Sequence, residues 1–178
     1  TPGYGGFSPR RITVSTVGFA PNLRRLAKEH PQVTITLSVH SPFAEQRAEL
    51  IPLERRFPLS ENLAILDEHV VSTRRKVYLA YLLIEGVNDS ADHLEELAQL
   101  VKSRSRPELF HVSVIRYNAA SGADPSYRTP PSHRVSEFVA ELDARGVHAT
   151  RRQQFGSSIS AACGQLHARS LLRPRRSS

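Results

Sequence analysis

Short apolar runs alternate along the chain with segments in which apolar residues recur at helical spacing. The runs are rich in β-branched or aromatic residues, and runs of that kind predict strands. They cover residues 11–17, 33–40, 76–84, 109–117 and 147–153. The third run, KVYLAYLLI, is almost continuously apolar, as expected of a strand that is covered on both faces.

Helical segments separate these predicted strands. The apolar spacing predicts helices over residues 21–30, 44–50 and 59–70. Ser90 is suited to cap the start of a fourth helix, and Gly146 to end a fifth. Alternation of strands and helices in this manner implies an α/β fold with parallel strands and right-handed crossovers.

The alternation amounts to four strand–helix units followed by a final strand. A complete eight-unit barrel needs about 250 residues, whereas this chain has 178. We therefore expect either a small open α/β domain or part of a barrel. The folded unit is predicted to span residues 11–166, after a loop over residues 1–10 and before a basic, disordered tail over residues 167–178.

The composition favours a folded cytoplasmic protein. Hydrophobic residues make up 39% and charged residues 23% of the chain, which predicts a core rather than disorder. No stretch reaches the roughly 18 apolar residues of a membrane span, and no secretory signal opens the chain. Cys163 is the one cysteine, so a disulfide within the chain is excluded and a reducing cytosol is expected.

The chain is basic, with 24 Lys and Arg residues against 17 Asp and Glu residues and a net charge of +7. This excess favours polyanionic partners, nucleic acid first. Arginine-rich stretches are also typical of the solvated surface of a basic soluble protein. Composition by itself leaves both interpretations open.

Small polar side chains and one imidazole follow the predicted strands, where ligands collect in parallel α/β folds. They are Ser15, Thr16, Ser38, His40 and Asn118, with the turn GVND (residues 86–89) after the third strand. Such groups suit a hydrogen-bonded ligand such as a nucleoside or an amino acid. Each alone is more typical of a cap or a turn, and only their convergence favours a site. The histidines lack zinc spacing, so no metal site is predicted. The sequence also has no glycine-rich phosphate loop.

Cys163 lies just past the last predicted strand, in the segment AACGQL (residues 161–166). A lone cysteine is most often an inert buried residue. Its small neighbours would instead let a bulky substrate approach, and a thiol there could act as a nucleophile or a group carrier. The residues alone leave both roles open.

Four motifs together resemble one family. They are RITVSTVG (residues 11–18), LSVHSP (37–42), GVNDS (86–90) and AACGQL (161–166). In this order and spacing the chain resembles the radical S-adenosylmethionine enzymes that methylate an adenosine of large-subunit ribosomal RNA, the family of Cfr and RlmN. STRRKVY (72–78) and IRYN (115–118) are more similar to the Cfr branch. The resemblance implies the C-terminal part of a partial (βα)6 radical-SAM barrel with parallel strands.

The resemblance also implies a site and a chemistry. The family holds S-adenosylmethionine at positions that match Ser15, Ser38, Val39, His40 and Asn118. Its methyl-accepting cysteine matches Cys163, and Cfr-like members methylate C8 of the adenine, which blocks antibiotics that bind the peptidyl-transferase centre. The family's [4Fe–4S] cluster needs an electron donor and three cysteines in a CxxxCxxC loop. This chain has one cysteine, so the resemblance puts the cluster ligands outside it.

Three hypotheses follow from these observations. The first is a C8-methylating, Cfr-like enzyme of 23S ribosomal RNA, of which this chain is a part that is inactive alone. The second is the same class of enzyme with the C2 specificity of RlmN. The third is a non-catalytic remnant that binds RNA or another chain through its basic surface. A missing barrel half also predicts exposed strand edges, so the isolated chain should be marginally stable or should associate.

Overall fold

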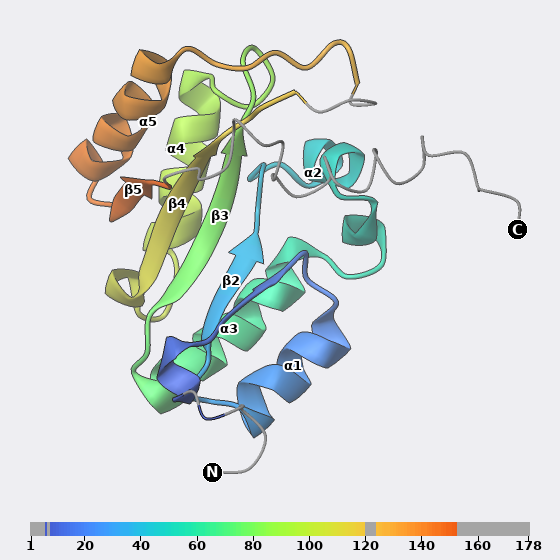
Figure 1. Ribbon diagram of the computed structural model, residues 1–178, viewed down its shortest axis with the longest axis vertical. Coiled ribbons are helices and arrows are strands. Elements are labelled where there is room, and N and C mark those ends of the chain that lie inside the picture. The colour runs from blue at the N-terminus through green and yellow to red at the C-terminus, as the bar shows by residue number, and fades with distance from the viewer. Residues whose placement is uncertain (1–5, 7, 120–123, 153–178) are drawn as a thin grey trace, which may run out of the picture.

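Five parallel strands form one sheet in the order β1-β2-β3-β4-β5 (Figure 1). The computed structural model of the chain describes residues 6, 8–119 and 124–152. The strands are β1 (Thr13–Thr16), β2 (Thr34–Ser38), β3 (Val77–Leu83), β4 (Phe110–Arg116) and β5 (Ala149–Arg151). Each lies within one of the predicted runs, so the parallel α/β prediction is confirmed.

A helix follows each of the first four strands, and β2 is followed by two. The helices are α1 (Ala20–Glu29), α2 (Ala44–Leu50), α3 (Leu59–Thr73), α4 (Ala91–Lys102) and α5 (Ser132–Ala144), with short 3-10 turns η1 (Pro9–Arg11), η2 (Pro52–Arg55) and η3 (Pro107–Leu109). Ser90 caps α4 as predicted, because its hydroxyl accepts from the backbone N–H of His93. Gly146 follows α5 with a φ of 78°, a conformation that favours glycine. Among the described residues, no helix is long and apolar enough to cross a membrane.

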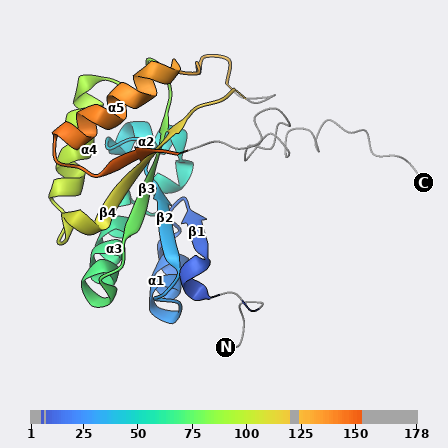
Figure 2. The ribbon, with the colours of Figure 1, turned by 60° about the vertical axis from the view of Figure 1, so that its left-hand side comes forward.

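Helices α1, α3, α4 and α5 cover one face of the sheet (Figure 2). The core takes alternate residues of the three central strands, and all of them are buried: Ile35, Leu37, Val77, Leu79, Tyr81, Leu83, Phe110, Val112 and Val114. Burial of apolar area on this face is the main stabilising contribution to the fold. No residue of β1 belongs to this core.

The intervening residues of the strands point to the opposite side of the sheet, here named the helix-free face. The strand register aligns them in rows: Ser15, Thr36, Tyr78 and His111 in one, and Ser38, Ala80, Ser113 and Thr150 in the next. All but Ala80 are polar, and all but Thr36 and Ala80 are half-buried or exposed. Strand β3 is thus covered by helices on one face rather than on both, and Tyr78 and Leu82 on its other face are half-buried.

The strand order and the one-sided helices distinguish between the two expected architectures. A doubly wound sheet has helices on both faces and a reversal of strand order, and the described sheet has neither. Strand β1 instead forms an open edge, and a groove lined by Val14, Thr16, Leu23 and Leu26 runs between it and α1. These features fit a partial TIM-like barrel.

Candidate functional site

The predicted residues Ser15 and Ser38 lie together on the helix-free face. Ser15 is in β1, and Ser38 is the last residue of β2. The registers pair Ser15 with Thr36 and Ser38 with Ala80, so both hydroxyls project from the same side of the sheet. Ser15 is exposed and Ser38 is half-buried. Both can therefore donate hydrogen bonds to a ligand on this face.

His40 extends the sheet through its side chain. Its backbone has a φ of 60°, and its Nδ1 accepts a hydrogen bond from the backbone N–H of Leu82 at 3.0 Å. Burial first, and then the positive charge of Arg47, lower the pKa of His40 to about 4. The imidazole is therefore neutral near pH 7 and carries its proton on Nε2, where it can serve as a donor.

Val39 has its side chain in the core and not on the helix-free face. Its backbone N–H donates to the carbonyl of Ala80 at 2.9 Å, and its carbonyl accepts from Nε of Arg47 at 3.1 Å. The structure thus gives Val39 a packing position, and any contact with a ligand is left to its backbone oxygen.

Asn88 in the GVND turn shapes the end of β3. Its side chain is fully buried. The amide nitrogen donates to the carbonyls of His40 and Leu82, each at 2.7 Å, and the amide oxygen accepts from the N–H of Ile84 at 2.7 Å. These bonds satisfy the side-chain amide within the fold. Asn88 therefore closes a turn and joins β2 to β3, a structural role rather than a ligand-binding one.

The carboxyl end of β4 brings an aromatic hydroxyl next to the predicted Asn118. Asn118 is half-buried directly after Tyr117. Tyr117 is buried, and within the described part of the chain its hydroxyl has no hydrogen-bond partner. A buried hydroxyl without a hydrogen bond costs free energy, and a hydrogen bond to a ligand or to a protein group removes that cost. This end of the sheet therefore has an unused hydrogen-bonding group.

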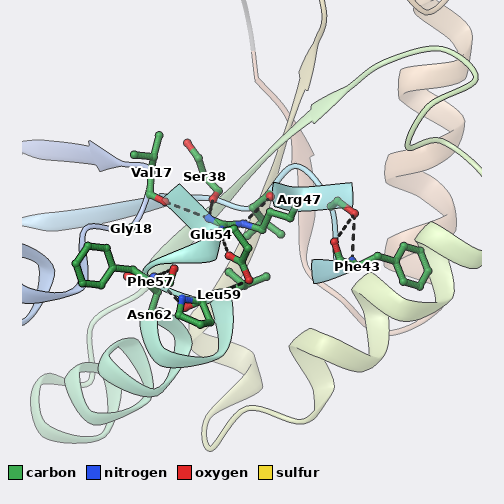
Figure 3. Close-up of polar contacts among 12 residues, drawn as sticks. Val17, Gly18, Ser38, Phe43, Arg47, Glu54, Phe57, Leu59 and Asn62 are labelled. Atoms are coloured by element: carbon green, nitrogen blue, oxygen red, sulfur yellow. Dashed lines mark hydrogen bonds and ion pairs between the residues drawn. The ribbon is translucent and has the colours of Figure 1, made fainter. Parts of the chain in front are cut away.

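Sequence reasoning missed a buried ion pair beneath these strand ends, between Arg47 of α2 and Glu54 of η2 (Figure 3). The Arg47 side chain is 0% exposed and that of Glu54 is 6% exposed. No local signal distinguishes Arg47 from the surface arginines, because a charged residue in a short helix is normally solvated.

Apolar side chains are exposed where the first two strands end. Three of the four exposed large hydrophobic residues in the described ranges are found here: Val17, Phe19 and Phe43. Phe19 meets Phe57 edge to face at 4.8 Å between ring centroids, and the guanidinium of Arg56 lies 5.3 Å from the Phe57 ring centroid. Aromatic rings beside arginines are suited to unstacked nucleobases.

The predicted methyl-accepting cysteine cannot be placed in this site. Cys163 and its AACGQL segment lie outside the described residues. The described residues also contain no group of three or more His, Cys, Asp or Glu side chains that could hold a metal ion.

Comparison with solved structures places this geometry in a class. No family model matches the chain. It is similar to a radical SAM methyltransferase from Sphaerobacter thermophilus, with a TM-score of 0.81 and 43% identity over 89% of this chain and 45% of that one. A domain of pyruvate-formate lyase-activating enzyme from Bacteroides vulgatus, at 17% identity and a TM-score of 0.59 over 79% of this chain and 80% of that one, shares the fold. Fold and sequence together relate the chain to radical SAM methyltransferases.

Curated relatives narrow the class. The protein named ribosomal RNA large subunit methyltransferase Cfr in Staphylococcus aureus is 44% identical over 167 residues, which is 93% of this chain and 48% of that protein. The Cfr protein of Clostridium botulinum strain Loch Maree is 46% identical over 162 residues, or 90% of this chain and 46% of that protein. At these identities the chain is a relative of the Cfr proteins, and it spans about half the length of the curated relatives it matches.

Proposed function

We propose that this chain is part of a radical S-adenosylmethionine methyltransferase that modifies C8 of an adenine in 23S ribosomal RNA. The observation that carries the proposal is the 44% identity to Cfr proteins over 93% of the chain. The strand ends described above would receive the cofactor, and the exposed aromatic and basic side chains beside them would receive RNA. In this proposal the protein is cytoplasmic and draws electrons from a separate donor.

The residues at the strand ends fit S-adenosylmethionine. The hydroxyls of Ser15 and Ser38 and the neutral imidazole of His40 offer donors and acceptors to an adenosyl group and an amino acid moiety. The buried hydroxyl of Tyr117, which lacks a partner within the described residues, adds a group that a ligand can satisfy. We propose that Asn118 contributes beside it.

S-Adenosylmethionine supplies an electrophilic methyl group when it is bound. Cys163 would accept that methyl group as a thioether: the sulfur–carbon bond to Cys163 forms as the methyl–sulfonium bond breaks, S-adenosylhomocysteine leaves and the thiol proton is released. A [4Fe–4S] cluster does not fit this chain, because one cysteine cannot supply the three thiolates that such a cluster needs. The cluster ligands would come from elsewhere in the complete protein, and no step through the cluster is assigned to these residues.

The substrate would approach the strand ends from the side that carries Phe19 and Phe43. Arg55 and Arg56 are exposed, and the guanidinium of Arg56 lies over the Phe57 ring, which contacts Phe19. A flipped or looped-out adenine can stack on an aromatic ring while arginines contact its phosphates. RNA affinity from such contacts falls steeply as salt is raised.

The test is expression of the complete reading frame that contains this chain in a drug-sensitive bacterium. Mass spectrometry of the peptidyl-transferase adenosines then reads the product. We expect a C8-methyl mark that is lost in Cys163→Ala and kept in Ser126→Ala, a matched change at an exposed site. A C2-methyl mark would support the RlmN-type alternative. An unmodified base in cells that express the unaltered protein or Ser126→Ala would contradict the proposal and favour the non-catalytic remnant.

A further inference from the structure

Arg47 occupies the point at which β1 and β2 separate. The backbone ladder between these strands ends at the pair Thr16 and Leu37. Beyond it, Nη2 of Arg47 donates to the carbonyl of Val17 at 3.0 Å and to that of Ser38 at 2.8 Å (Figure 3). The guanidinium therefore joins the two strand ends where backbone pairing stops.

The same side chain also holds Val39, the residue that follows β2. Its Nε donates to the carbonyl of Val39 at 3.1 Å. A guanidinium has five N–H donors in a rigid plane, so one side chain can fix three carbonyls at once. A lysine in its place has a compact, rotatable ammonium group and lacks that geometry.

Glu54 holds Arg47 in this orientation. One carboxylate oxygen pairs with Nη1 of Arg47, and the other accepts from the backbone N–H of Leu59, the first residue of α3, at 3.0 Å. Burial lowers the pKa of Arg47, and the negative charge and hydrogen bond of Glu54 oppose that shift. Buried ion pairs are often no more stabilising than apolar residues of similar volume. Stability alone is therefore a weak reason for a charged pair at this position.

Asn88 holds the other side of the same segment. Its amide nitrogen bridges the carbonyls of His40 and Leu82. The stretch from Ser38 to His40 is thus fixed by Arg47 toward β1 and by Asn88 toward β3. That stretch carries two of the side chains assigned to the cofactor under the proposed function.

We propose that Arg47, oriented by Glu54, is a positioning residue that sets the backbone at the carboxyl ends of β1 and β2 and so places Ser38 and His40 for ligand binding. The inference about ligand binding rests on the proposed function. The inference about the backbone does not, because it follows from the contacts of Arg47 alone.

The test compares Arg47→Lys with Arg104→Lys in the full 178-residue chain. Arg104 pairs with Asp67 at 3.1 Å and lies between α4 and β4, at the amino ends of the strands, so its replacement is a matched control. Amide hydrogen exchange is followed by NMR at Val39 and Leu82, whose N–H groups bond to the Ala80 carbonyl and to His40. Val112, which donates to the carbonyl of His148 at 2.9 Å, reports on global opening.

We expect Arg47→Lys to accelerate exchange at Val39 and Leu82 about tenfold more than at Val112. Arg104→Lys should change the three amides equally. Titration calorimetry with S-adenosylmethionine should show about tenfold weaker binding for Arg47→Lys only. If Arg47→Lys does not fold, Glu54→Gln tests the same amides, because it keeps the acceptor for Leu59 while weakening the pair.

Two outcomes separate this inference from the proposed function. If exchange at Val39 and Leu82 rises only as much as at Val112, Arg47 supports global stability alone and the positioning role is overturned. If exchange rises locally but the unaltered chain does not bind S-adenosylmethionine, the positioning of the backbone stands. The assignment of the cofactor to these strand ends by this chain alone then fails.

Discussion

The two faces of the sheet differ sharply in composition, although they alternate residue by residue along the same strands. On the helix-covered face, β3 presents Val77, Leu79, Tyr81 and Leu83, all of them buried. On the helix-free face, the rows across β1 to β5 consist mainly of Thr, Ser, Tyr and His. The first face stabilises the fold. The second is left with hydrogen-bonding groups, so the same strands can carry chemistry without weakening the core.

The largest expected effect compares two leucines of β3 that lie on opposite faces. Leu79 is fully buried under the helices, whereas Leu82 is half-buried on the helix-free face. Leu79→Ala should lower the free energy of unfolding by about 3–4 kcal/mol, because it removes apolar contacts and leaves a cavity. Leu82→Ala should lower it by about 1 kcal/mol. Urea unfolding followed by circular dichroism measures both, and equal losses would mean that the two faces are packed alike.

An intermediate effect comes from the histidine that joins β2 to β3. The pKa of His40 is lowered from an ordinary 6.5 to about 4 in the folded chain. Between these pH values the unfolded chain binds more protons than the folded chain. The part of the unfolding free energy that comes from His40 is therefore fully present above pH 6.5 and is lost as the pH falls toward 4. For His40 alone the loss is about 2 kcal/mol between pH 7 and pH 5. Burial also lowers the pKa of His69, His93 and His111, which adds to the loss.

A single substitution separates the contribution of His40 from the others. Asparagine tolerates a positive φ, and its amide oxygen can accept a hydrogen bond from the N–H of Leu82. His40→Asn should therefore reduce the pH dependence of the unfolding free energy between pH 7 and pH 5, while the remaining histidines keep theirs. An unchanged slope in this variant would show that His40 is protonated in the folded chain near its ordinary pKa.

The strands and helices could be predicted because their signals are local. Short apolar runs located every strand that the structure describes, and α2 has the predicted bounds Ala44–Leu50. The strand period also places Ser15 and Ser38 on one face once the register is known. The role of Arg47 could not be predicted, because its partners lie between 7 and 30 positions away in the sequence. A charged side chain in a short helix becomes buried only through such distant contacts, which no local pattern records.

The smallest effect on stability distinguishes the carboxyl end of the helix-free face from its amino end. Thr34 and Ser38 lie at opposite ends of β2, on the same face, and both are half-buried. Thr34→Val and Ser38→Ala each remove one hydroxyl, and each should change the free energy of unfolding by less than about 1 kcal/mol. Under the proposed function, Ser38→Ala should weaken S-adenosylmethionine binding about tenfold, the equivalent of one lost hydrogen bond, and Thr34→Val should leave it unchanged. Titration calorimetry measures the affinity of both variants for S-adenosylmethionine. Equal affinities of Ser38→Ala and Thr34→Val would mean that the ligand does not contact the end of β2, because the two hydroxyls lie on one face at opposite ends of the strand.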